Sequence, residues 1–178
     1  MPLSDSLCRY VDEHCLTLPS VEEKGLRAVI DTNVVLDLVF WHDKKAVDLA
    51  RLLKEGKLTA VRDRESMKEL AEVASRPHFL GSEEKAGTLV EAWCRESLAA
   101  DEAAVRVQDD TLKVKCKDPL DQKFLSLTVA SKAPLLITKD KLVLKAGKRL
   151  RRFGTLCVKP EEVSSALEIL AAQQPLII

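Results

Sequence analysis

Two aspartates follow short apolar runs of the kind that form buried parallel strands. Asp31 comes directly after Ala28-Val29-Ile30, and Asp140 comes just after the run at 134–138. Parallel sheets bury such runs on both faces and place their ligands at the carboxyl ends of the strands. A carboxylate at this edge could bind a cation, or Asp31 could be only the N-cap of the next helix, a position that Asp favours. Chemistry at Asp31 therefore requires partners elsewhere in the chain.

Three further acids are predicted near the same edge. Asp118 and Asp121 lie in the first turn of a predicted helix. The proline after Asp118 suits the first helical position, so Asp118 is expected to be the N-cap and Asp121 to point toward the strand ends. Glu69 lies in another helix, where Glu65, Glu69 and Glu72 share one face. Any of these three could belong to a site, or all could be solvated surface.

Carboxylates gathered at one edge of a sheet repel one another unless a cation lies among them. Oxygen-only ligand sets, without Cys or His, favour Mg²⁺ or Mn²⁺ over zinc. Such an ion makes hydroxide from water, orients a phosphate and neutralises charge on the leaving oxygen, which suits phosphodiester hydrolysis. Asn33 could cap a helix, or it could orient Asp31 without binding a ligand itself. The Thr138 hydroxyl could orient water or a ligand, or Thr138 could be a strand-end residue only.

The periodicity of apolar residues predicts strands that alternate with helices. Strands are expected at 27–30, 58–61, 105–107, 134–138 and 155–158, and helices at 4–16, 43–55, 63–75, 82–100, 118–130, 141–146 and 160–172. This alternation is typical of an α/β fold with a largely parallel sheet. The predicted organisation is an N-terminal extension at 1–24, one domain at 25–173 and a C-terminal tail at 174–178.

Composition places the chain among soluble, globular proteins. Its 178 residues suffice for one domain, with a hydrophobic share of 46% and a charged share of 31%. No apolar run approaches the roughly 18 residues of a membrane span, and no signal peptide is expected. The five scattered cysteines form no zinc-type spacing with the three histidines. Free thiols in a reduced, cytoplasmic compartment are therefore expected.

Charge is distributed unevenly along the chain. The net charge is zero, but residues 1–110 carry −7 and residues 111–178 carry +7. Seven basic residues surround or follow Asp140 within fourteen positions: Lys139, Lys141, Lys145, Lys148, Arg149, Arg151 and Arg152. They form either a track for a phosphate backbone or a solvated face. Aromatic residues make up only 4% of the chain, so extensive base stacking is not expected.

Four motifs in order resemble those of the PIN-domain nucleases, in particular the branch of bacterial toxin–antitoxin toxins. They are Val29-Ile30-Asp31-Thr32-Asn33, Glu69-Leu70 with Val73 and Arg76-Pro77, Asp118-Pro119-Leu120-Asp121, and Leu136-Ile137-Thr138-Lys139-Asp140. The resemblance covers roughly residues 27–160 and leaves 1–24 unexplained. No single motif is specific, and it is their order and spacing that indicate the family.

The resemblance implies a three-layer α/β/α fold around a central, mainly parallel sheet with an acidic pocket. It also implies a Mg²⁺- or Mn²⁺-dependent endoribonuclease, in which metal-activated water attacks in line and leaves a 5′-phosphate and a 3′-hydroxyl. Matched by position, the catalytic and metal-binding acids are Asp31, Glu69, Asp121 and Asp140, with Asp118 as a fifth acid and Asn33 and Thr138 as polar supports. The partners considered are RNA, an antitoxin protein and a second copy in a homodimer, with no membrane.

Two positions depart from the pattern of this branch. Lys139 stands where a Gly is common, and it could weaken ion binding or contact the substrate phosphate. Gln122 stands where a further Asp is frequent. Two rival functions remain open. One is a phosphatase that forms an aspartyl-phosphate, although its chemistry requires a second acid at the position of Asn33. The other is a non-catalytic module that binds RNA or protein.

Overall fold

Five parallel strands form one sheet in the order β3-β2-β1-β4-β5. The computed structural model describes residues 3–17 and 21–173, so the predicted tail at 174–178 lies outside the described residues. The strands are β1 Leu26–Ile30, β2 Leu58–Arg62, β3 Leu98–Ala99, β4 Leu135–Ile137 and β5 Leu156–Val158. The predicted α/β class with a parallel sheet is confirmed.

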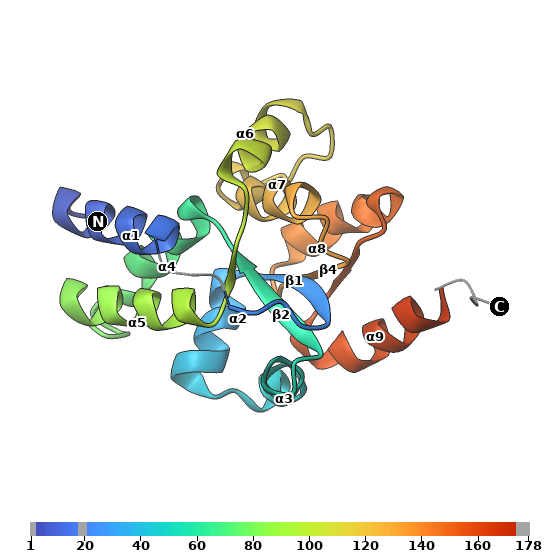
Figure 1. The fold of residues 1–178 in the computed structure, drawn as a ribbon, viewed down its shortest axis with the longest axis horizontal. Coiled ribbons are helices and arrows are strands. Elements are labelled where there is room, and N and C mark those ends of the chain that lie inside the picture. Colours follow the sequence, from blue (N-terminus) through green and yellow to red (C-terminus); the bar gives the residue numbers. More distant parts are fainter. Residues whose placement is uncertain (1–2, 18–20, 174–178) are drawn as a thin grey trace.

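Helices connect successive strands (Figure 1). The α-helices are α1 Asp5–Thr17, α2 Thr32–Leu36, α3 Val47–Lys54, α4 Arg64–Ala74, α5 Glu83–Arg95, α6 Glu102–Thr111, α7 Gln122–Ala130, α8 Lys141–Gly147 and α9 Val163–Ala172. Shorter helical turns are the π-turn η1 Asp37–Trp41 and the 3₁₀ turns η2 Lys44–Ala46, η3 Pro119–Asp121, η4 Lys148–Phe153 and η5 Pro160–Glu162. Side-chain caps set several starts: Asp63 forms a capping box with Ser66 at α4, and Ser82 caps α5.

Alternation along β1 divides the core into two layers, one on each face of the sheet. Ala28 and Ile30 pack into a cluster with apolar side chains of α1 to α5 and α9, whereas Val29 packs with α6, α7 and α8. Figure 1 shows α6, α7 and α8 on one side of the sheet and α3 on the other. Both faces of the sheet are covered, so the strands are mainly apolar and the arrangement is a three-layer α/β/α fold.

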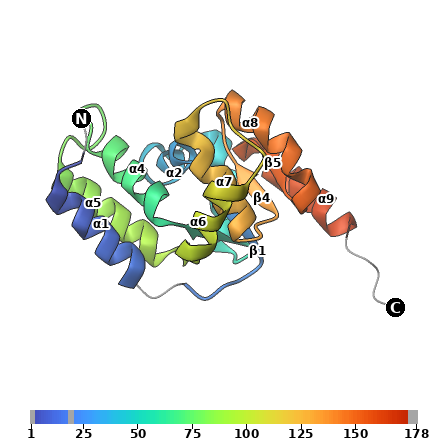
Figure 2. The ribbon, with the colours of Figure 1, turned by 90° about the horizontal axis from the view of Figure 1, so that it is seen from above.

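Helix α1 packs against α4 and α5, and the three helices lie side by side (Figure 2). Its buried side chains Leu7, Val11 and Cys15 belong to the same core cluster as Ala28 and Ile30 of β1. Arg62, fully buried at the end of β2, donates to the backbone carbonyls of Cys15 and Cys94 at 3.3 and 2.6 Å. The segment predicted as an extension at 1–24 thus contributes a helix to the same core as residues 25–173.

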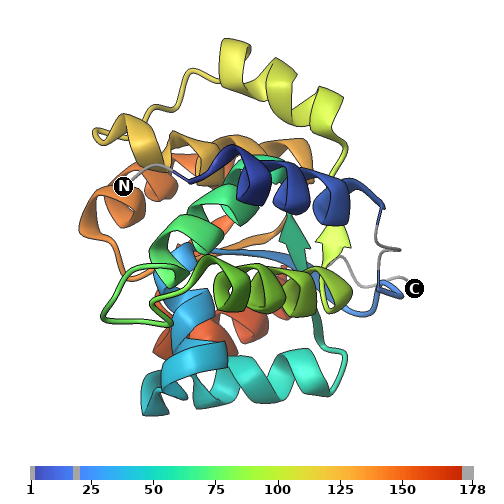
Figure 3. The ribbon, with the colours of Figure 1, turned by 90° about the vertical axis from the view of Figure 1, so that its left-hand side faces the viewer.

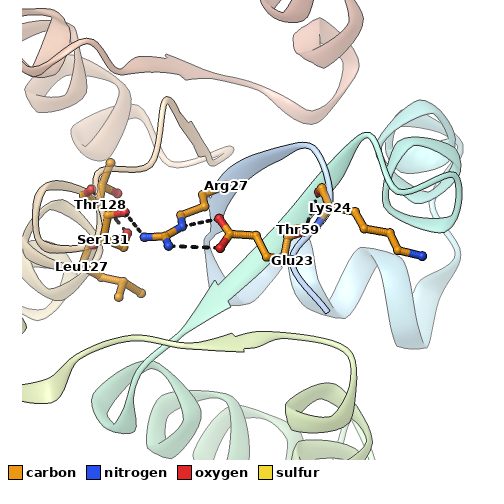
Figure 4. Close-up of polar contacts among 7 residues, drawn as sticks. All are labelled: Glu23, Lys24, Arg27, Thr59, Leu127, Thr128 and Ser131. Carbon is orange, nitrogen blue, oxygen red and sulfur yellow. Dashed lines mark hydrogen bonds and ion pairs between the residues drawn. The ribbon is translucent and has the colours of Figure 1, made fainter. Parts of the chain in front are cut away.

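The start of β1 is fixed by polar contacts on the side of the sheet away from its carboxyl edge (Figure 4). Arg27 pairs with Glu23 at 2.6 Å and donates to the backbone carbonyl of Ser131 at 2.8 Å. Gly25 has a φ of +68°, and a Cβ there would collide with the carbonyl of Lys57. Only glycine fits this close approach between the chain entering β1 and the turn before β2.

One predicted strand is wrong, and a strand lies where helix was predicted. Residues 105–107 belong to α6, which begins after Asp101, whose side chain accepts from the amides of Ala103 and Ala104. The alternating Val-Arg-Val at 105–107 reflects a helix with Val105 buried and Val107 exposed. The predicted helix at 82–100 ends at Arg95, because the chain then turns to add the two-residue edge strand β3 beside β2.

Candidate functional site

A cavity of about 340 Å³ opens at the carboxyl ends of β1 and β4. Four acids from four different parts of the chain line it: Asp31, Glu69, Asp121 and Asp140. Asn33 and Arg76 also line it, and the name acidic cavity is used below for this site. The sheet brings β1 and β4 together as neighbours, so residues more than a hundred positions apart meet at one edge.

Asp31 is buried, with only 5% of its surface exposed. Its Oδ2 accepts a hydrogen bond from the Thr138 hydroxyl at 2.6 Å, and its side chain makes no N-cap bond to α2. Burial raises the pKa of Asp31, opposed by the Thr138 hydroxyl and reinforced by the nearby charge of Glu69. Capping therefore does not account for the carboxylate at this position.

Asp140 has two roles at once. Its Oδ1 caps α8 by accepting from the amides of Leu142 and Val143 at 2.8 and 3.2 Å. The Oγ1 of Thr138 accepts from the amide of Asp140 at 3.0 Å and also donates to Asp31. Thr138, fully buried, thereby fixes the two strand-end aspartates relative to each other.

The structure distinguishes Glu69 from its neighbours on the same helix face. Its Oε2 accepts from the Thr32 hydroxyl at 2.8 Å and lies 3.2 Å from the Lys123 ammonium. Glu65 is exposed beside Lys68, whereas Glu69 lines the acidic cavity. One member of the acidic stripe on α4 is thus placed at the site by its position opposite the start of α2.

Asp118 and Asp121 are separated as their helix start predicts. Asp118 Oδ1 accepts from the amide of Leu120 at 3.0 Å, so it caps the turn that Pro119 begins. Asp121 lines the acidic cavity, whereas Asp118 is not among the lining residues. Burial, followed by the charges of Asp31 and the other nearby acids, raises the pKa of Asp121 to about 6.

Comparison with known families is decisive at this point. The family model for the PIN domain matches residues 27–142, which include all five of these acids. The chain belongs to the PIN-domain family. Its fold also resembles a chain in the crystal structure of VapBC2 from Rickettsia felis bound to a DNA fragment from their promoter. That match has a TM-score of 0.53 and 15% identity, and covers 75% of this chain and 98% of the other. No curated protein matches significantly.

The donor set of this PIN domain fits a hard divalent cation. Among the described residues, no group of three His, Cys, Asp or Glu side chains is arranged to hold an ion between them. Mg²⁺, however, keeps several waters and binds proteins through one or two carboxylates. Burial and then the charges of Asp31 and Asp140 raise the pKa of Asp121, and a cation would relieve the repulsion between these charges. The carboxylates of Asp31, Asp121 and Asp140 are the side chains that could hold Mg²⁺ or Mn²⁺ here.

Several residues at the acidic cavity were not identified from the sequence. Arg76, His78 and Phe79 line it from the loop after α4, and Lys123 pairs with Glu69 from α7. In the sequence, Arg76-Pro77 indicated the end of a helix and formed part of one family motif, but no role at the site was predicted for Arg76. Gln122 has a structural role away from the cavity, because its side chain bonds the backbone of Val114 and Cys116.

The seven basic residues of the predicted RNA track are all exposed, on α8 and η4 and just before Asp140. Lys139 pairs with the buried carboxylate of Asp37 at 2.5 Å. Arg149 donates to the backbone carbonyl of Lys115 at 2.9 Å. Since Asp140 lines the acidic cavity and is the N-cap of α8, this basic surface starts beside the cavity. Among the described residues, no helix is long and apolar enough to cross a membrane.

Proposed function

We propose that this PIN domain is a Mg²⁺- or Mn²⁺-dependent endoribonuclease. The observation that carries the proposal is the convergence of Asp31, Glu69, Asp121 and Asp140 on one cavity, where Asp121 has a pKa raised to about 6. Repulsion among these carboxylates destabilises the folded state unless a bound cation neutralises their charge. Perturbed carboxyl groups in a cavity are typical of a catalytic site.

Each side chain has a distinct task in this proposal. Asp31 and Asp140, locked by the Thr138 hydroxyl, would hold the ion together with Asp121. When bound, the ion supplies hydroxide at neutral pH and neutralises charge on the phosphate. Glu69, fixed by Thr32 and Lys123, can orient or accept a proton from water at the cavity. Arg76, which also lines the cavity, can offer a positive charge to a phosphate oxygen.

RNA is the proposed substrate because an exposed basic surface adjoins the acidic cavity. The seven Lys and Arg residues of α8, η4 and Lys139 can neutralise backbone phosphates without reading sequence. A strand lying along this surface would pass Asp140, which caps α8 at the cavity rim. Cleavage there yields a 5′-phosphate and a 3′-hydroxyl.

A mixed pool of single-stranded RNA tests the activity. Cleavage is expected with Mn²⁺ or Mg²⁺ and is lost in EDTA, and the products should carry 5′-phosphates. The Glu168→Gln variant, which changes an exposed carboxylate on α9, serves as the matched control for Asp31→Asn. Release of inorganic phosphate without strand scission would support the phosphatase instead. Equal RNA affinity with and without metal, and no cleavage, would support a binding module.

An antitoxin protein is the proposed natural partner, and the cytoplasm the proposed compartment. The resemblance of the fold to a chain of the VapBC2 complex motivates the partner, and all five cysteines are free in this structure. Co-expression with the product of an adjacent short reading frame should suppress cleavage and yield a co-purifying complex. Cleavage that continues undiminished in such a complex would contradict the toxin assignment, and size exclusion of the free chain would show whether it forms a homodimer.

A further inference from the structure

Three of the seven Phe, Trp and Tyr side chains gather at one place on the surface. The ring centroids of Phe40 and Trp41 are 4.7 Å apart, and Phe79 lies 5.7 and 5.8 Å from them. His78 adds a fourth ring, 4.6 Å from Phe79. The name aromatic platform is used below for Trp41, His78 and Phe79; Phe40 and Phe79 are partly buried and pack against the core.

The platform is built from two segments far apart in the sequence. Trp41 ends the π-turn η1, and the next residue, His42, has a left-handed backbone with a φ of 49°. His78 and Phe79 come from the loop between α4 and α5, which folds back through a bond from the Phe79 amide to the Arg76 carbonyl. Figure 3 shows η1 in light blue beside this green loop. The fold thus presents Trp41 with 55% of its surface exposed.

The aromatic platform is continuous with the acidic cavity. His78 and Phe79 line the same cavity as Asp31 and Asp121, and Arg76 lines it as well. Exposed apolar groups that gather in one patch, as Trp41 and the rings beside it do, mark an interaction site. The exposed indole can stack a base, while Arg76 and the carboxylates of the acidic cavity can engage the adjacent phosphate.

We infer that the aromatic platform stacks an unpaired nucleobase next to the phosphate that the acidic cavity cleaves. The inference rests on the proposed nuclease function and adds to it a binding residue, Trp41, for one base of the substrate. Stacking requires an open base face, so a base held in a duplex cannot use the platform. Because every base has such a face, the platform selects for single strands more than for sequence.

Intrinsic fluorescence tests the inference, because the chain has two tryptophans in different settings. Trp41 is 55% exposed and Trp93 only 6%, so a base that stacks on the platform should quench Trp41 alone. The probes are a short single-stranded oligoribonucleotide, the same strand with one abasic position moved along it, and the matched duplex, all in EDTA to prevent cleavage. Fluorescence anisotropy of the labelled strands gives the affinity independently.

Four variants separate the effect of Trp41 on RNA affinity from its effect on fluorescence quenching. Trp41→Ala should weaken binding of the single strand by about five- to 100-fold. Trp41→Phe keeps an aromatic face and should retain most affinity but lose the quenching, whereas Trp93→Phe should keep both. Val107→Ala truncates another exposed apolar residue, on α6 away from the acidic cavity, and should change nothing. One abasic position should weaken wild-type binding about as much as Trp41→Ala does, and should add nothing in that variant.

The outcomes distinguish this inference from the nuclease proposal. If wild type cleaves RNA, but Trp41→Ala binds and cleaves as well as wild type, the platform is refuted and the nuclease stands. If the strand quenches Trp41 but no metal supports cleavage, the nuclease is refuted and the platform stands. Equal affinity for intact and abasic strands, or a Trp41-dependent complex formed only with a protein partner, would overturn base stacking.

Discussion

Replacing Asp121 by Asn should stabilise the metal-free domain at neutral pH. Burial and the charges of Asp31 and Asp140 raise the pKa of Asp121 from 3.8 to about 6. The folded-state pKa exceeds the unfolded one, so this carboxyl group contributes stability that is complete below pH 3.8 and is lost as the pH rises through about 6. Above that pH the folded domain holds a repelled carboxylate, and an amide of nearly the same shape removes the repulsion.

The size of the effect follows from the pKa shift and the exposure of the side chain. A shift of about two units corresponds to about 3 kcal/mol. Asp121 is only half-buried, and solvent screening reduces the expected gain for Asp121→Asn to about 1 kcal/mol. In a domain of this size, about 1 kcal/mol changes Tm by about 2–4 °C.

Thermal melting in EDTA measures the stability gained by Asp121→Asn in the absence of metal. At neutral pH Asp121→Asn should melt about 2–4 °C above wild type, and near pH 4 the two should coincide because the wild-type carboxyl group is then protonated. Glu168→Gln makes the same kind of change on the exposed face of α9 and should leave Tm unchanged. Saturating Mn²⁺ should raise Tm of wild type more than that of the variant. Equal Tm values for wild type and Asp121→Asn in EDTA at neutral pH would refute the charge-repulsion reasoning.

Two further predictions concern the helix start and the basic surface. Asp118→Asn should change stability by less than about 0.5 kcal/mol, since Asn caps as well as Asp, and should reduce cleavage only partly, whereas Asp121→Asn should abolish it; an inactive Asp118 variant beside an active Asp121 variant would reverse these roles. Replacing Arg149, Arg151 and Arg152 together by Ala should flatten the slope of log affinity for single-stranded RNA against log salt by about 2. An unchanged slope would assign the three charges to ordinary surface.

The parts of the fold that the sequence predicts are those where local pattern and burial agree. The run Ala28-Val29-Ile30 is apolar at every position because β1 is covered on both faces, so it was recognisable as a parallel strand. Strand β3 has two residues and one partner strand, and its backbone pairing has no signature in side-chain pattern. Val105 and Val107 alternate like a strand but lie in a helix that the Asp101 cap begins.

The residues of the candidate site also fall into those that the sequence predicts and those that depend on tertiary contacts. Asp31 and Asp140 were placed by strand ends, which parallel topology brings to one edge. Glu69 could not be chosen from its acidic stripe, because the choice depends on where α2 and α7 present Thr32 and Lys123. The aromatic platform was not predicted, because aromatic content is low and composition carries no information on position. The fold brings Phe79 next to Phe40 and Trp41, which are distant in the sequence.

Metal-dependent cleavage of single-stranded RNA by wild type and Asp31→Asn, purified side by side, tests the central claim most directly. The carboxamide oxygen that Asp31→Asn introduces can still accept the Thr138 hydrogen bond, so the variant should fold while losing one charge from the acidic cavity. Wild type should cleave an end-labelled strand in proportion to bound Mn²⁺, and Asp31→Asn should show no cleavage at any Mn²⁺ concentration. Equal cleavage by the two proteins, or cleavage by wild type that persists in EDTA, would contradict a carboxylate-held metal as the source of the activity.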